Sequence, residues 1–298
     1  MLSPAPPTLK RRIGAYVALT KPRIIELLLV TTVPTMVVAE KGLPSVWLMV
    51  ATVLGGTLSA GGANAINMYV DRDIDRLMKR TQNRPLVTGI IEPRNALIFA
   101  IVIEVIAFAW LWAFVNLLSA ALAVAACLFY VFVYTLWLKR TSTSNIVIGG
   151  AAGAAPVLIG WSAVTNSLGW APVVLFAVIF VWTPPHFWAL AIRYRDDYEA
   201  AEVPMLPVVA SLHTVALRIV MYSVVLWALT LVFAAVGGMG ALYLVAAIVL
   251  GAVFTTMAVS VLRTPTAAKA MALFGYSISY LTLLFAAMAA DQLVRSGW

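Results

Sequence analysis

Long apolar runs separated by short polar connections dominate the chain. A run of about twenty uncharged residues is the length that an α-helix needs to cross the hydrocarbon core of a bilayer. A transmembrane β-barrel would instead show segments of about ten residues with alternating polarity. The pattern predicts an all-α integral membrane protein with nine transmembrane helices, near residues 24–40, 46–66, 95–115, 117–137, 145–164, 170–191, 214–236, 240–262 and 270–290.

Composition agrees with this pattern. Of the 298 residues, 63% are hydrophobic and 11% are charged, whereas about a quarter of the residues in a soluble domain are charged. Pro4, Pro6 and Pro7 argue against an amphipathic targeting helix at the start, and no cleavage site follows. We therefore expect a tail over residues 1–20 and one transmembrane domain over residues 1–298.

The basic residues predict the orientation. All but two of the 20 Lys and Arg residues fall on one side of the predicted spans, and the exceptions are Lys41 and Arg295. Because cytoplasmic loops are enriched in Lys and Arg, we expect a cytoplasmic N-terminus and an outer C-terminus. The net charge of +8 then reflects this enrichment of basic residues on the cytoplasmic side. No segment resembles a module that binds nucleic acid.

Two long loops on the cytoplasmic side, residues 67–94 and 192–213, hold most of the acidic residues. In the first, Asn67, Asp71 and Asp75 are spaced by four, so a continuing helix would place all three on one face. Carboxylate and amide oxygens suit Mg²⁺, which keeps some water and completes its octahedron with substrate phosphates. The alternative is a helix end with charge pairs at the membrane surface.

Basic residues follow this acidic ladder closely. Their cations would hold a diphosphate and favour its departure as an anion. At the end of the fourth span, Lys139 and Arg140 either bind the same diphosphate or only anchor the helix at the cytoplasmic side. The basic residues of the first loop are Arg72, Arg76, Lys79, Arg80 and Arg84.

The second loop begins with Arg193 and carries the pair Asp196 and Asp197. Two carboxylates there could hold a second Mg²⁺, so that two ions clamp a diphosphate from opposite sides. The alternative is a solvated loop. We predict Arg193 as a diphosphate contact and both aspartates as metal ligands.

Three residues inside the spans raise further questions. His186 follows Pro184 and Pro185, which should interrupt helical hydrogen bonding and open room for a planar ligand. Its ring either contacts such a ligand or activates water, or it has only a structural role. Glu104 lies near the middle of a span, where we expect a buried pair, and Cys127 is expected to pack.

Together these motifs resemble the UbiA superfamily of intramembrane prenyltransferases, and within it the branch that farnesylates haem. The resemblance runs from about residue 18 to the last span. Two positions depart from it, since Arg193 stands four before Asp197 where the superfamily often has Asp, and Glu202 replaces a usual Gly. The motifs that carry it are Lys21-Pro22-Arg23, Asn67-x-x-x-Asp71-x-x-x-Asp75, Asn83-Arg84-Pro85-Leu86, Tyr134-Thr135, Trp182-Thr-Pro-Pro-His186-Phe-Trp188, Asp196-Asp197-Tyr198 and Pro204-Met-Leu-Pro207.

The resemblance implies a Mg²⁺-dependent enzyme in a bacterial cytoplasmic membrane. It implies transfer of farnesyl from farnesyl diphosphate to a vinyl group of haem b, with addition of water, to give haem O and diphosphate. Haem b is then a substrate, and association with a haem A synthase or a terminal oxidase assembly is left open. The implied catalytic residues are Asn67, Asp71, Asp75, Arg84 and His186.

Two other functions remain as alternatives. A polyprenyltransferase acting on an aromatic quinone precursor would share the first acidic motif but would not need the segment from Trp182 to Trp188. A multi-pass transporter would place acids and broken helices near the membrane midplane. Glu104 is the main support for a transporter, because nearly all other acids lie at one face.

Overall fold

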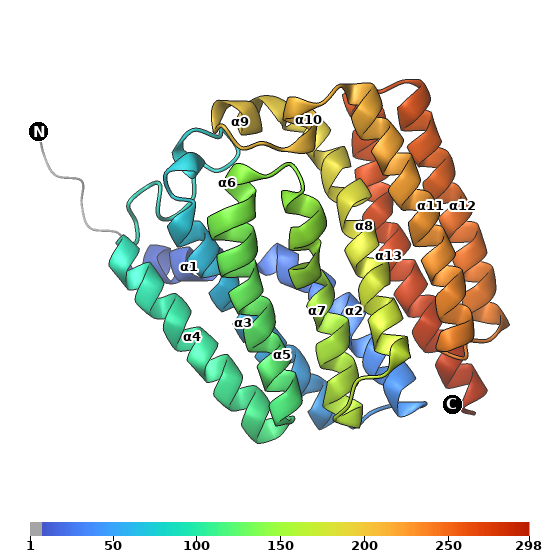
Figure 1. Cartoon of the computed structure of the whole chain (residues 1–298). Coiled ribbons are helices and arrows are strands. Elements are labelled where there is room, and N and C mark those ends of the chain that lie inside the picture. Colours follow the sequence, from blue (N-terminus) through green and yellow to red (C-terminus); the bar gives the residue numbers. More distant parts are fainter. Residues whose placement is uncertain (1–7, 298) are drawn as a thin grey trace, which may run out of the picture.

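The computed structural model describes residues 8–297, without the side chains of residues 23–29. Every element of regular structure in this part of the chain is helical (Figure 1). The long helices are α2 Pro22–Glu40, α3 Val46–Val70, α4 Pro93–Phe114, α5 Leu117–Leu128 continued by η2 Phe129–Leu138, α7 Asn145–Thr165, α8 Trp170–Arg193, α11 Leu212–Val236, α12 Ala241–Arg263 and α13 Ala267–Arg295.

Each predicted span coincides with one of these helices, with ends that differ by up to five residues. Among the described residues, eight helices are long and apolar enough to cross a membrane. The remaining helix, α2, contributes the shorter apolar stretch Val30–Glu40. The chain is therefore a multi-pass integral membrane protein.

Short elements cover one end of the bundle, which we call the capped end (Figure 1). They are the turn η1 Ile74–Arg76 after α3, and α6 Lys139–Thr141, α9 Arg195–Ala200 and α10 Leu206–Val209. Both long loops of the sequence thus lie at the same end, as the sequence predicted.

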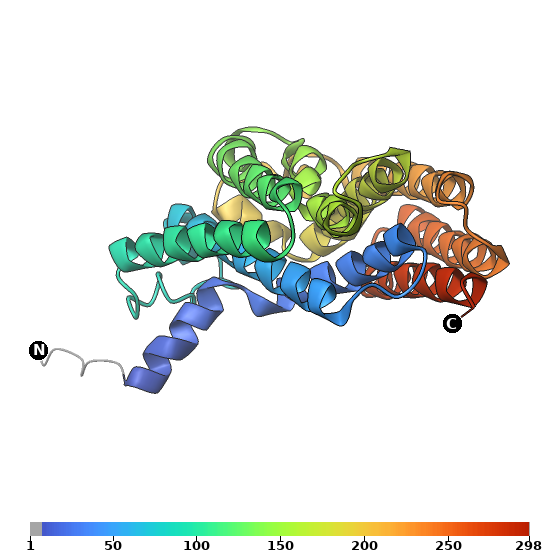
Figure 2. The ribbon, with the colours of Figure 1, turned by 90° about the horizontal axis from the view of Figure 1, so that it is seen from below.

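A helix that the sequence did not predict, α1 Leu9–Leu19, occupies most of the expected tail. The Thr8 hydroxyl accepts a hydrogen bond from the Arg11 amide and caps its N-terminus. Ala15 and Leu19 are its buried residues, and they pack with Ala65 and Met68 of α3. Figure 2 shows α1 at the edge of the bundle. The prolines at residues 4, 6 and 7 lie outside the described residues.

Close packing of α3 against α4 depends on glycine. A Cβ on Gly55 would lie 2.5 Å from the Leu111 side chain, and one on Gly62 would lie 2.7 Å from the carboxylate of Glu104. Helices in a bilayer associate through such close approaches, because lipid provides no hydrophobic driving force between them.

The continuation of α5 is a π-helix rather than an α-helix. Over Phe129–Leu138 the backbone winds more widely, and the Thr135 hydroxyl bonds to the carbonyl oxygen of Tyr130, five residues earlier, at 2.8 Å. π-Helical segments are rare and often occur at functional sites. By contrast, α8 continues without interruption through Pro184 and Pro185, so the predicted break there is wrong.

Candidate active site

The first acidic motif lies where α3 ends. The α-helix stops at Val70, so it does not continue through Asp75 as the ladder assumed. Asp71 nevertheless bonds to the carbonyl of Asn67 through its backbone N–H at 2.9 Å, and Asp75 bonds to Asp71 in the same way at 2.9 Å. The i to i+4 spacing therefore survives the change of helix type, and the three residues remain about one turn apart.

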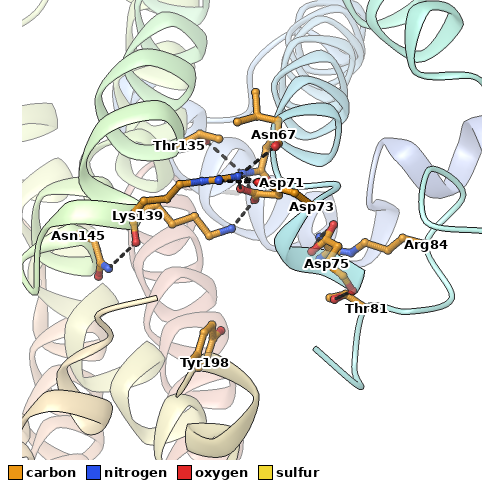
Figure 3. A network of polar contacts seen from close by, with 12 residues as sticks. Asn67, Asp71, Asp73, Asp75, Thr81, Arg84, Thr135, Lys139, Asn145 and Tyr198 are labelled. Carbon is orange, nitrogen blue, oxygen red and sulfur yellow. Dashed lines mark hydrogen bonds and ion pairs between the residues drawn. The ribbon is translucent and has the colours of Figure 1, made fainter. Parts of the chain in front are cut away.

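Asp71 is at the centre of a buried polar cluster (Figure 3). Its side chain is fully buried and forms an ion pair with Lys139. Asn67 donates a second hydrogen bond to the same carboxylate oxygen, Oδ2, at 2.8 Å. The other oxygen, Oδ1, is buried and accepts no hydrogen bond from any described residue, although Arg140 lies 3.8 Å away.

Asp75 is also fully buried, and it is paired within its own loop. One Arg84 nitrogen lies 2.6 and 2.7 Å from the two carboxylate oxygens. The Thr81 hydroxyl donates to the backbone carbonyl of Asp75 at 2.8 Å. These bonds fold the loop after α3 back on itself, so that Arg84 reaches a carboxylate nine residues earlier.

Two residues that the sequence analysis did not assign to the site complete the cluster. The Lys21 ammonium donates to the side-chain oxygen of Asn67 at 2.7 Å, and the Asn67 amide donates to Thr135 at 3.1 Å. Lys21 has a left-handed backbone (φ 53°), which is uncommon for a residue with a Cβ. Burial, with repulsion by Arg84 and Lys139, lowers the pKa of Lys21 to about 7. The Lys21-Pro22-Arg23 and Tyr134-Thr135 motifs were the available signals.

A separate basic hollow of about 400 Å³ lies beside the cluster, lined by Arg72, Arg76 and Arg140 among others. Arg140 holds Asp73 through two hydrogen bonds of 2.7 Å, and these lower the pKa of Asp73 to about 2. Arg72 donates to the Tyr69 carbonyl at 2.6 Å and lies over the Tyr69 ring. Arg72 and Arg140 therefore border this hollow, and only Arg140 also approaches Asp71.

The second acidic loop touches the first through Arg80. The Arg80 backbone N–H donates to Asp197 at 3.3 Å, and its guanidinium donates to the Tyr198 hydroxyl at 3.3 Å. Asp196, in contrast, is exposed. The structure thus brings Asp197 to the first loop. Among the side chains that the structure describes, it does not gather three from His, Cys, Asp or Glu into a ready metal cluster.

Two of the predicted diphosphate contacts lie at the surface of the capped end. Lys79 follows η1 and is exposed, and Arg193, the last residue of α8, is exposed as well. Neither has the buried carboxylate partner that Arg84 and Lys139 have. Burial therefore separates Arg84 and Lys139, which pair with buried carboxylates, from Lys79 and Arg193, which lie at the surface.

Below the cluster, an apolar cavity of about 170 Å³ lies between α2, α3, α5, η2 and α7. Small side chains line most of it, and the two ends along α3 are Asn64 and Thr52. Asn64 precedes Asn67 by less than one turn, and the cavity-lining Tyr130 bonds to Thr135 through its carbonyl. The cavity thus begins directly beneath the polar cluster and extends about 18 Å along α3, at 1.5 Å per residue.

His186 does not line this cavity. Its ring stacks against Trp182 and Phe274, with centroids 4.2 and 4.7 Å away, and its Nδ1 lies 2.6 Å from the Ser277 hydroxyl. These contacts place His186 against α13. The structure therefore places His186 apart from the aspartates, and nothing in the sequence indicated Ser277 as its partner.

Glu104 lacks the charged partner that we expected. Its carboxylate accepts a hydrogen bond from Ser59 at 2.8 Å, and its second oxygen is buried with no partner among the described residues. Cys127 is buried, as predicted, and lines the cavity together with Ser59. A transporter-like row of midplane acids is not found in the described part of the chain.

Comparison with known proteins identifies the family. The sequence profile of the UbiA prenyltransferase family matches residues 28–287. The chain belongs to the UbiA prenyltransferase family. It is thus a prenyltransferase, in agreement with the resemblance that the motifs suggested.

Close relatives of this UbiA chain share one name. The protoheme IX farnesyltransferase of Parafrankia sp. is 58% identical, covering 95% of this chain and 91% of its own length. That of Kineococcus radiotolerans is 53% identical, covering 96% and 90%. That of Streptomyces avermitilis is 52% identical, covering 95% of each chain.

Solved structures show the same UbiA fold at low sequence identity. A digeranylgeranylglyceryl phosphate synthase superposes with a TM-score of 0.78 at 16% identity, covering 95% of this chain and 99% of its own. A UbiA homologue from Archaeoglobus fulgidus bound to GPP and Mg²⁺ superposes with a TM-score of 0.68 at 18% identity, covering 92% and 99%.

Proposed function

We propose that this chain transfers the farnesyl group of farnesyl diphosphate to a vinyl group of haem b, with addition of water, to give haem O and diphosphate. Identity above 50% with several relatives named protoheme IX farnesyltransferase supports both the donor and the acceptor. The observation within the molecule that carries the proposal is the junction between the buried polar cluster and the apolar cavity.

This junction matches the two chemical parts of the donor. Arg84 and Lys139 pair with Asp75 and Asp71, and Lys21 beside Asn67 adds a further basic group, so the cluster favours an anion such as diphosphate. A farnesyl chain, with eleven main-chain bonds of about 1.5 Å, extends to about 14 Å. The cavity along α3 is about 18 Å long and lined mainly by small apolar residues.

Mg²⁺ fits the residues present. The unbonded and fully buried Oδ1 of Asp71 is an oxygen that a cation would satisfy, and Mg²⁺ needs only one or two protein carboxylates because substrate phosphates and water complete its octahedron. We assign Asn67, Asp71 and Asp75 as its ligands in the first loop, and Asp197 rather than the exposed Asp196 in the second. Bound Mg²⁺ would neutralise negative charge on the departing diphosphate.

The reaction breaks the bond between farnesyl C1 and the diphosphate oxygen and forms a carbon–carbon bond to the terminal vinyl carbon. Water adds to the other vinyl carbon and a proton is released. Lys21, Arg84, Lys139 and Arg140 hold the leaving diphosphate, and this stabilises the charge that develops as the bond breaks. The apolar cavity keeps water from the farnesyl cation.

The placement of the chain in the membrane is part of the proposal. We propose nine spans, with α2 as the first, an N-terminus in the cytoplasm and a C-terminus outside, in a bacterial cytoplasmic membrane. The distribution of basic residues supports this orientation. Residues 1–298 form one domain, and the loops 67–94 and 192–213 act at the cytoplasmic face.

Product analysis of the purified protein in lipid nanodiscs tests the proposal. With Mg²⁺, farnesyl diphosphate and haem b, we expect a product heavier than haem by one farnesyl group and one hydroxyl. An aromatic quinone precursor offered in place of haem should remain unmodified. Prenylation of that acceptor with no change in haem would contradict the proposal and favour a quinone-type prenyltransferase.

A further inference from the structure

The first described helix, α1, lies across the bundle rather than along it. In Figure 1 it runs across the direction of the long helices, and Figure 2 shows it extending outward from them. Its buried residues Ala15 and Leu19 belong to one apolar cluster with Ala65 of α3 and Ala96 of α4. Ala65 and Ala96 are five and three residues from the capped ends of their helices, so α1 lies within about 8 Å of this end. This is the depth at which lipid headgroups meet acyl chains.

A second apolar face of α1 points away from the protein. Leu9, Ile13 and Val17 are 74%, 56% and 52% exposed. At 100° per residue they cover about 80° of the helix surface, and we call these three residues the outer stripe. Gly14 and Ala18 are exposed on another face. The buried face, the outer stripe and the small-residue face are about 120° apart, as in a helix that meets protein, acyl chains and water on its three sides.

Three consecutive basic residues, Lys10, Arg11 and Arg12, occupy the first turn of α1. All three are exposed, and none forms an ion pair with a side chain that the structure describes. Cations are unfavourable at this end of a helix, because the helix dipole is positive there, and the first turn contains no acid. An anionic partner would offset this repulsion. Lys10 and Arg12 flank the outer stripe, so their side chains can reach headgroups while the stripe lies among acyl chains.

The other end of α1 leads directly into the polar cluster. The Thr20 hydroxyl donates to the carbonyl of Val17 at 2.8 Å, and the Thr20 carbonyl accepts a hydrogen bond from the Asn64 amide at 3.2 Å. The next residue, Lys21, has a left-handed backbone and donates to Asn67 at 2.7 Å. The direction in which α1 leaves the bundle is therefore determined beside the residue that presents the Lys21 ammonium. A displacement of α1 would move this ammonium relative to Asn67.

We propose that α1 is an interfacial helix that binds anionic phospholipid and that this binding positions Lys21 at the diphosphate site. The outer stripe lies among the acyl chains, and the three basic residues contact headgroup phosphates. Charge complementarity favours anionic lipid over a second copy of this chain, because α1 of a second copy would bring the same three cations to the contact. Basic segments at the cytoplasmic face of a membrane bind anionic lipid in this way. The positioning of Lys21 rests on the proposed function, since diphosphate is the ligand there, whereas the lipid contact does not.

Fluorescence quenching by brominated lipids tests the lipid contact. Bimane is attached at residue 13 of the full-length protein through Ile13→Cys, after the single native cysteine is removed by Cys127→Ala. Nanodiscs contain brominated phosphatidylcholine or brominated phosphatidylglycerol at the same mole fraction. We expect quenching by both lipids, about twofold stronger with phosphatidylglycerol. A label on the water face at Ala18 should be quenched much less, and a label at the exposed Val245 of α12 should be quenched equally by both lipids.

Replacing the three basic residues of α1 by glutamine separates the effect of charge from that of exposure. The preference for phosphatidylglycerol at residue 13 should disappear, while quenching by phosphatidylcholine remains. A matched triple variant of exposed basic residues elsewhere should keep the preference, and it consists of Arg94→Gln, Arg218→Gln and Arg263→Gln. Absence of quenching at residue 13 would show that protein covers the outer stripe, as a second copy would, and would overturn the proposal. Equal quenching by both lipids in the otherwise unchanged chain would exclude anionic lipid as the partner.

Binding of farnesyl thiolodiphosphate, a slowly ionising analogue, tests the positioning of Lys21 without turnover. Ile13→Ser combined with Val17→Ser should weaken binding about fivefold, because the Lys21 ammonium loses its place. Gly14→Ser combined with Ala18→Ser makes the same change on the water face and should leave the affinity within a factor of two.

A double-mutant cycle decides whether α1 acts through Lys21. Lys21→Ala should weaken binding of the analogue, and adding the two serines of the outer stripe to Lys21→Ala should weaken it no further. Full additivity, or wild-type affinity of the Ile13→Ser and Val17→Ser variant, would overturn the positioning role. If the wild type bound no analogue while the bimane results held, the proposed function would fail and the lipid contact would stand.

Discussion

The two halves of the helix bundle are built differently. Helices α8, α11, α12 and α13 share one continuous apolar core, in which Phe233, Phe254 and Phe285 are almost completely buried. In the half formed by α2 to α7, the buried apolar residues form several smaller groups, and a cavity and a buried charge cluster lie among them. We call these the solid half and the hollow half.

The difference teaches how stability and chemistry can be divided within one membrane domain. Helices in lipid are held together mainly by van der Waals packing, and large aromatic side chains supply much of it in the solid half. The hollow half has less of this packing, because many of the residues that line its cavity are glycine and alanine. Substitutions of core residues in the solid half should therefore mainly affect stability, and substitutions around the cavity of the hollow half should mainly affect catalysis.

The largest expected effect is that of Asp71→Asn in the hollow half. Loss of the charge beside Lys139 should lower kcat/KM for farnesyl diphosphate by about 10²–10³-fold, as removal of one preorganised charge-stabilising group does in other enzymes. Initial rates at several Mg²⁺ concentrations measure it. Glu199→Gln, an exposed acid in α9, is the matched control and should stay within twofold. Near-normal activity of Asp71→Asn at low Mg²⁺ would mean that the motif is only structural.

Arg84→Ala should have the next largest effect. It removes the only ion-pair partner that the described residues offer Asp75 and one cation for the diphosphate, so we expect a rise of about tenfold in KM and a slower chemical step. Steady-state and single-turnover kinetics separate the two. The exposed Arg94 provides a control, since Arg94→Ala removes a cation outside the cluster. An unchanged dependence on the prenyl diphosphate would remove Arg84 from the site.

Filling the cavity should change chain-length selectivity. Gly56 lines the cavity eleven residues before Asn67, and a Cβ added there would meet no atom within 4 Å. A leucine would lie about 16 Å below Asn67, where the last isoprene unit ends. Gly56→Leu should therefore shift the ratio of geranyl to farnesyl transfer by about tenfold. Gly275→Leu, at an exposed helical glycine that also has free space, should leave this ratio unchanged.

A cavity made in the solid half should lower stability and leave catalysis unchanged. Phe285→Ala removes a fully buried ring and should destabilise the protein by about 2 kcal/mol or more, while kcat per folded molecule remains close to wild type. Thermal unfolding in detergent measures the first effect, and activity normalised to folded protein measures the second. Leu283→Ala changes an exposed residue of the same helix and serves as control. A large loss of kcat in the folded fraction would contradict the division between the halves.

The smallest effect concerns the exposed ion pair between Asp73 and Arg140. Because the pKa of Asp73 is lowered to about 2, any stability from this pair is present above the ordinary carboxyl pKa and is lost only as the pH falls towards 2. The pair should therefore contribute no pH dependence between pH 5 and 8, and Asp73→Asn should change the Tm by less than about 2 °C. Unfolding curves across this pH range test it.

Much of the fold could be predicted because the bilayer imposes a simple rule on length and polarity. The apolar runs marked the long helices to within a few residues, and the acidic and basic motifs marked the capped end. The helix α1 was missed because it is short and has three basic residues in its first turn, so it carries no transmembrane signal. The unbroken α8 shows that a proline pair alone does not end a helix whose neighbours pack around it.

The candidate site was predicted less completely, because its contacts join distant parts of the chain. Asn67 meets Lys21, 46 residues earlier, and Asp71 meets Lys139, 68 residues later. Spacing along one helix indicated the aspartates but not these partners, which depend on how the helices pack. Ser277 was missed for the same reason, since its pairing with His186 spans 91 residues.

Because η2 is a π-helix, the number of residues in it determines where the side chains that follow it point. A π-helix holds more residues per turn than an α-helix, so the angular position of every later side chain depends on it. Thr135 meets Asn67 from within this segment, and Lys139 follows directly after it. Deleting one residue from Phe129–Leu138 would barely shorten the span, yet it would rotate Lys139 by roughly a quarter of a turn around the helix axis. The membrane would still accept the helix, but the ammonium would point away from Asp71, so this segment tolerates substitution of its apolar residues far better than a change in their number.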